Sequence, residues 1–166
     1  KNLNKMGGYL NKDVKNLDLE ALNLCKNSRF EDIQECFETY HDCYPSSSLM
    51  DFDQFDDIFG SMLGDPQPVF MALEDNKNMD GHVDIFESLA AAACFSRGHF
   101  EEKTRFLYKL FDFDDNGHLD VHELNLTLQA CARGLCKITE LPVPSRKNIE
   151  KIVLNCFKTM DRDHSG

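Results

Sequence analysis

The chain has 166 residues, enough for one domain or two small lobes, and a hydrophobic content of 42% allows it to bury a core. Its formal net charge of −11 argues against a nucleic-acid partner, because so acidic a chain has little with which to replace the counterions around phosphate. No apolar run reaches membrane-spanning length, and no signal peptide is visible. The seven cysteines lack Cys-x-x-Cys spacing, so we expect reduced, mostly buried thiols in a cytoplasmic protein.

Residues 1–29 are expected to form an N-terminal segment with a leading helix. Within this segment, residues 6–11 begin like a myristoylation signal, with Met6 followed by Gly7. Asn11 occupies the position where that signal needs a hydroxyl, and Met6 is internal. The sequence therefore argues against a lipid anchor.

Residues 30–40 and 52–63 each show the apolar spacing of an amphipathic helix. The loop between them, residues 41–54, has neither the glycine nor the final glutamate that a calcium loop requires. We predict that it binds no metal and instead pairs with the next loop, with Leu49 or Met50 facing Val83.

Residues 76–87 form a second loop with a turn glycine at its sixth position and glutamate at its twelfth. Helices are predicted on either side, at 69–75 and 86–95. The expected ligands are Asn76, Asn78, Asp80, the backbone carbonyl of His82, Asp84 and Glu87. Only three of these are carboxylates, so we expect weak calcium binding, with a purely structural role as the alternative.

Residues 112–123 match the full calcium-loop pattern, D-x-[DN]-x-[DN]-G-x5-E. The predicted ligands are Asp112, Asp114, Asn116, the backbone carbonyl of His118, Asp120 and Glu123. Four of them are carboxylates, so this loop is predicted to take calcium first. Helices are predicted at 101–111 and 121–133, the second ending near Gly134 as its C-cap.

A last helix is predicted at 147–160, followed by the start of another calcium loop at Asp161, Asp163 and Ser165. This loop lacks its final glutamate, because the sequence stops at Gly166. Leu119 of the preceding loop then has no sister strand to pair with. Since the first residue is Lys1, we expect the sequence to be a piece of a longer chain.

Repeated helix–loop–helix units predict an all-α fold of EF-hand pairs in two lobes, at 30–97 and 98–166, with short paired strands in the loops. More narrowly, the chain resembles the neuronal calcium sensor group and calaxin-like proteins. The resemblance rests on the disabled first loop with its Cys43-Tyr44-Pro45 element, on the segment 25–30, and on the 49-residue spacing between Asp112 and Asp161. It implies a cytoplasmic protein, with a cytoskeletal or ciliary location as a further option.

The sequence contains no nucleophile-and-base constellation or phosphate-binding loop, so we expect no enzymatic activity. The predicted function is that of a calcium sensor that opens an apolar groove for an amphipathic helix of a target protein. Candidate groove residues are Phe59, Met62, Phe70, Met71 and Phe95. Two alternatives stay open: a structural EF-hand subunit of a larger assembly, and a regulatory EF-hand module of a longer enzyme or channel.

Overall fold

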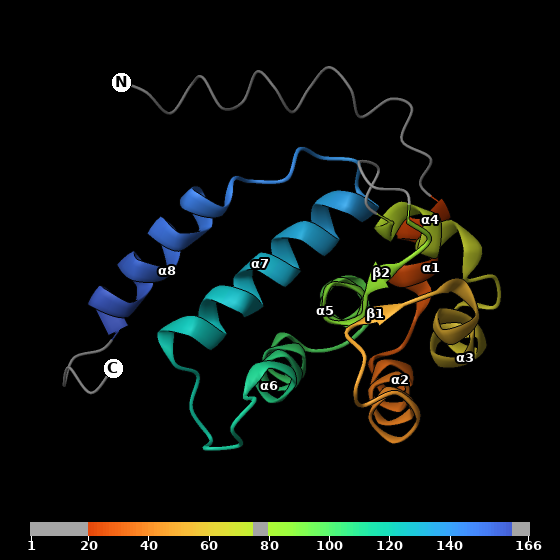
Figure 1. The fold of residues 1–166 in the computed structure, drawn as a ribbon, viewed down its shortest axis with the longest axis horizontal. Coiled ribbons are helices and arrows are strands. Elements are labelled where there is room, and N and C mark those ends of the chain that lie inside the picture. Colours follow the sequence, from red (N-terminus) through yellow and green to blue (C-terminus); the bar gives the residue numbers. More distant parts are fainter. Residues whose placement is uncertain (1–19, 75–79, 161–166) are drawn as a thin grey trace.

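The computed structural model describes residues 20–74 and 80–160, and these form an all-α fold with one small antiparallel sheet (Figure 1). In chain order the elements are α1 Glu20–Asn27, α2 Phe30–Cys43, β1 Leu49–Met50, α3 Phe52–Leu63, α4 Gln67–Leu73, β2 Val83–Asp84, α5 Ile85–Phe95, α6 Phe100–Phe111, α7 Val121–Ile138 and α8 Arg146–Met160. The predicted fold class is confirmed. The division into two lobes stays a prediction.

The sheet joins the first loop to the second. β1 and β2 are antiparallel, with Met50 opposite Val83 and both side chains buried. This confirms the predicted strand pair and selects Met50 over Leu49, which is 51% exposed. Directly after β1, the Asp51 carboxylate accepts a hydrogen bond from the Gln54 amide at 3.0 Å and caps α3. The acidic residue at this helix start therefore stabilises α3.

The helix boundaries agree with the sequence prediction at α3 and differ elsewhere by a few residues. The prediction for α7 was wrong at its end, because the helix runs through Gly134 to Ile138. Gly134 lies instead where α7 crosses α5: a Cβ atom at this position would be 2.5 Å from the Glu87 carbonyl oxygen and 2.8 Å from the Ala91 Cβ. The absence of a side chain allows the two helices to approach this closely.

The core is built around α5, which lies between the strand pair and α7 (Figure 1). Most of its apolar side chains are fully buried or nearly so, because helices from both halves of the chain cover them: Ile85, Leu89, Ala90, Ala91, Ala92 and Ala93. Because many of these side chains are small, the backbones of α5 and α7 can approach each other closely. α8 in turn packs on α7 through Ile149 and Val153.

The candidate groove residues fall into three classes of exposure. Phe59 and Phe70 are core residues, whereas Met62 and Phe95 are partly buried against the core. Met71 is 61% exposed on α4. Among the described residues, no helix has both the length and the apolar character needed to cross a membrane.

Candidate metal centre

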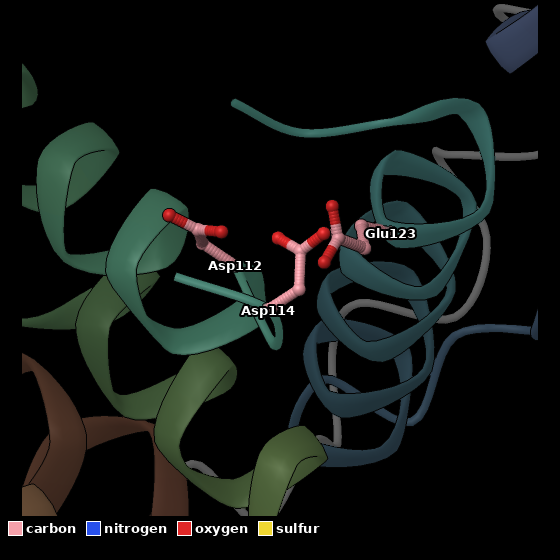
Figure 2. A group of neighbouring side chains, drawn as sticks. All are labelled: Asp112, Asp114 and Glu123. Atoms are coloured by element: carbon pink, nitrogen blue, oxygen red, sulfur yellow. The ribbon is translucent and has the colours of Figure 1, made fainter. Parts of the chain in front are cut away.

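The Asp112 loop connects α6 to α7 and brings three carboxylates together. Oxygen atoms of Asp112, Asp114 and Glu123 all lie within 4.8 Å of one another. In Figure 2, Asp112 and Asp114 extend from the loop at the end of α6, and Glu123 faces them from the first turn of α7. Residues eleven positions apart in sequence thus share one small space, as the loop pattern predicts.

Hydrogen bonds within the loop fix the first two carboxylates. Both Asp112 oxygens accept from backbone amides, Oδ1 from Asn116 at 3.1 Å and Oδ2 from Gly117 at 3.0 Å. Asp114 Oδ2 accepts from the Asn116 side chain at 2.8 Å. Gly117 has a φ of 76°, the left-handed conformation that the turn requires and that glycine adopts without strain. The chain therefore folds back around its own acidic side chains.

Glu123 is turned into the loop by the cap of α7. Its amide donates to the Asp120 side chain at 2.8 Å, and its Oε2 accepts from the Asp120 amide at 3.0 Å, which forms a capping box. Its Oε1 accepts from the Phe113 amide at 2.9 Å. The residue is buried, with an exposed fraction of 6%. The capping box of α7 thus places the carboxylate of Glu123, the predicted bidentate ligand, at the loop.

This donor set fits calcium. The three clustered groups are carboxylates, the hard oxygen ligands that calcium prefers at about 2.3–2.6 Å, so ligands on opposite sides of an ion lie up to about 4.6–5.2 Å apart. The three oxygen atoms all lie within 4.8 Å of one another, close enough to contact one ion. Of the other predicted ligands, Asn116 accepts through Oδ1 from the His118 amide at 2.7 Å, and Asp120 caps α7.

Of the second loop, the structure describes residues 80–87, whereas Asn76 and Asn78 lie outside the described residues. The Gly81 amide donates to the Glu74 side chain at 2.8 Å, and Glu74 lies before the loop. Asp84 caps α5 by accepting from the Glu87 amide at 2.9 Å. Burial raises the pKa of Asp84 above its ordinary value, because desolvation disfavours the charged carboxylate.

Glu87, the predicted final ligand of the second loop, is engaged with α7. Its two carboxylate oxygens form ion pairs with Arg133 Nε and with Lys137 Nζ, the latter at 2.7 Å. Sequence reasoning missed both basic residues. Their spacing of four places them on one helix face, but nothing in the sequence indicates which acidic group they meet.

The remaining predicted site residues are placed as follows. Asp161, Asp163 and Ser165 lie outside the described residues. In the first loop, the Tyr44 hydroxyl donates to Asp57 at 2.5 Å, and this hydrogen bond raises the Tyr44 pKa to about 12. The absence of metal binding at that loop stays a prediction.

No protein-family model matches the chain. It is 32% identical over 94 residues to guanylyl cyclase-activating protein 2 of Gallus gallus, a match covering 55% of this chain and 47% of that protein. It is 30% identical over 91 residues to calaxin of Homo sapiens, covering 55% of this chain and 41% of calaxin. Guanylyl cyclase-activating protein 2 of Lithobates pipiens is 24% identical over 166 residues, covering 97% of this chain and 79% of that protein.

The chain therefore spans less than half of the length of the first two relatives. Both are EF-hand proteins of the neuronal calcium sensor group. Their similarity agrees with the helix–loop–helix repeat, the paired loop strands and the converging carboxylates described above. The chain has an all-α fold of EF-hand helix–loop–helix units and resembles the neuronal calcium sensor and calaxin-like group.

Proposed function

We propose that this protein is a calcium-binding regulator whose primary site is the Asp112 loop. The observation that carries the proposal is the convergence of Asp112, Asp114 and Glu123 at the junction of α6 and α7. Asn116, Asp120 and the backbone carbonyl of His118 would complete the coordination sphere. Calcium would neutralise carboxylates that now face one another.

The regulatory output is proposed to be a change in the angle between α6 and α7. Glu123 lies in the first turn of α7, so a shift of its carboxylate toward an ion moves that helix. α7 packs on both α5 and α8, and its movement would alter apolar contacts on two sides. The surface uncovered would bind an amphipathic helix of a target protein, in the cytoplasm or at a cilium or the cytoskeleton.

A second candidate is a structural EF-hand subunit of a larger assembly, or a regulatory module of a longer enzyme or channel. The observation that favours it is the state of the first two loops. Asp51 caps a helix, and Glu87 is held by basic residues of α7. In that case the hands would serve as a fixed helical scaffold. Calcium at the Asp112 loop would then leave the helix arrangement unchanged.

The experiment is calcium calorimetry combined with NMR of the Gly117 amide, which donates to Asp112 and reports on this loop. The wild-type chain should bind calcium with a dissociation constant in the sensor range of about 10⁻⁷–10⁻⁵ M if the partner loop is complete. Glu123→Gln should remove the tightest step, because it replaces the bidentate carboxylate with an amide. Glu101→Gln, an equal charge change at an exposed residue of α6, is the matched control. An unchanged isotherm in Glu123→Gln would refute the site.

A further inference from the structure

The side chains of Cys94 on α5 and Cys131 on α7 are in contact. The Cys131 thiol donates a hydrogen bond to the sulfur of Cys94. The two residues are far apart in the sequence, and α5 and α7 lie against each other in the fold (Figure 1). The packing of these two helices therefore brings together a pair of thiols that no sequence motif marks.

The close crossing of α5 and α7 accounts for this contact. Cys94 follows Ala91 by three residues and Cys131 precedes Gly134 by three, so each cysteine shares a helix face with a residue of the crossing. A Cβ atom at Gly134 would lie only 2.8 Å from the Ala91 Cβ. A disulfide requires Cβ atoms about 3.5–4.5 Å apart, a separation that helices reach only where they pack closely. One turn from this crossing, two short cysteine side chains can meet.

The two thiols are accessible to a small reagent. Cys94 and Cys131 are both partly buried, and Cys131 packs against the core. Cys25 and Cys36, in contrast, are buried, and burial raises the pKa of each thiol to about 12. These two thiols are shielded and stay protonated, so they are poor nucleophiles.

The surroundings of Cys94 favour its thiolate, the reactive form of cysteine. The hydrogen bond from Cys131 lowers the pKa of the Cys94 thiol below its ordinary value, and the positive charge of Lys103 acts in the same direction against the effect of burial. Lys103 is held there because its Nζ donates to the carbonyl oxygens of Cys94 at 3.1 Å and Ser96 at 2.6 Å. The hydrogen bond to Cys94 also raises the pKa of Cys131. Cys94 is therefore the attacking sulfur, and Cys131 keeps its proton.

We propose that Cys94 and Cys131 form an oxidation site, at which a hydroperoxide converts the two thiols to a disulfide between α5 and α7. This inference goes beyond the proposed function and holds whether or not the Asp112 loop binds calcium.

The reaction proceeds in two steps. The Cys94 thiolate attacks the terminal oxygen of the hydroperoxide, the O–O bond breaks, and the leaving alkoxide takes up a proton to become an alcohol. Cys94 is then a sulfenic acid. The Cys131 sulfur attacks the Cys94 sulfur, the S–O bond breaks, and the oxygen leaves as water with the proton of Cys131. The two thiols lose two electrons in total, and the hydroperoxide accepts them.

The test treats the reduced full chain with one equivalent of hydrogen peroxide. Remaining thiols are then alkylated, and the disulfide-linked peptides are identified by mass spectrometry. The number of free thiols should fall by two from the seven of the reduced chain, and the linked peptides should contain Cys94 and Cys131. The same treatment in concentrated urea should lose this preference, because the contact depends on the packing of α5 and α7.

Serine variants separate the two sulfur roles. In Cys131→Ser the second step is blocked, so sulfenic acid should accumulate at Cys94, where a cyclic diketone traps it. In Cys94→Ser the attacking sulfur is missing, so Cys131 should stay a thiol. Cys136→Ser is the matched control, since it removes another partly buried thiol of α7 and should leave the Cys94–Cys131 disulfide unchanged. Peptide mapping of the wild type needs no variant, so it decides the matter even if a variant does not fold.

Three results would overturn the oxidation site. The first is a folded wild-type chain in which the first disulfide joins other cysteines, or in which Cys94 and Cys131 both remain thiols. The second is a sulfenic acid trapped at another cysteine, but not at Cys94, in Cys131→Ser. The third is a Cys94–Cys131 disulfide that forms equally well in urea. None of these results bears on calcium binding at the Asp112 loop, so the proposed function stands or fails separately.

Discussion

Replacing Gly134 by alanine tests the close crossing of α7 and α5. In an exposed helix interior, glycine to alanine stabilises by about 0.8–1.0 kcal/mol, because alanine has the higher helix propensity. At this position, however, the new Cβ would lie 2.5 Å from the Glu87 carbonyl oxygen and 2.8 Å from the Ala91 Cβ. One of these atoms belongs to the backbone of a buried helix, so it cannot rotate away.

The expected change in the free energy of unfolding follows from these two opposing effects. Overpacking of a tight interior costs about 1–3 kcal/mol, and more where the backbone must shift. Because the clash is with a backbone atom, the upper part of this range, about 2–3 kcal/mol, applies. After subtracting the gain of about 0.8–1.0 kcal/mol in propensity, we expect Gly134→Ala to lower the free energy of unfolding by about 1–2 kcal/mol. For a chain of this length, that corresponds to a melting temperature lower by about 2–8 °C.

Gly60→Ala is the matched control, because Gly60 also lies inside a helix, α3. There the atom nearest to the new Cβ is a carboxylate oxygen of Asp56, the end of an exposed side chain that can turn into solvent. We expect this substitution to raise the free energy of unfolding by about 0.5–1 kcal/mol. Both variants are compared by thermal and urea unfolding followed by circular dichroism. A Gly134→Ala protein as stable as Gly60→Ala would show that α5 and α7 do not approach as closely as described.

Three further predictions concern the loops and the core. Replacing Asp42 or Asp53 by alanine should leave the number of bound calcium ions in calorimetry unchanged, because the first loop lacks its glycine and glutamate; loss of one ion in either variant would contradict this. A chain extended past Gly166 to complete the last loop should bind a hydrophobic dye more strongly with calcium than with chelator, and an equal signal would favour the scaffold. Burial raises the pKa of the Cys25 and Cys36 thiols from 9.0 to about 12, so the folded state favours their neutral form. This contribution is fully present below pH 9.0 and is lost as the pH rises toward about 12, so the urea midpoint should fall over this range. Cys36→Ala should make the fall shallower, whereas an equal slope would refute this origin.

The sequence by itself predicted the convergence of Asp112, Asp114 and Glu123 and the presence of the strand pair. The spacing of Asp112, Asp114 and Glu123 encodes a loop whose bonds are local, most of them between residues fewer than six positions apart. Local interactions of this kind do not depend on the rest of the fold, so a pattern of twelve residues is sufficient to predict them. The strand pair, with Leu49 or Met50 opposite Val83, was likewise predictable, because paired EF-hand loops require apolar contacts at this position, and the structure selects Met50.

Only the tertiary structure decided the roles of Gly134 and Glu87. A glycine near the end of an apolar repeat is typical of a C-cap. In the structure the helix continues through Gly134, and the glycine lies where α5 packs closely against α7. Glu87 has the same sequence context as Glu123, yet its partners are 46 and 50 residues away. Contacts over such distances depend on how the helices pack, and a single sequence carries no periodicity that specifies which helix faces meet.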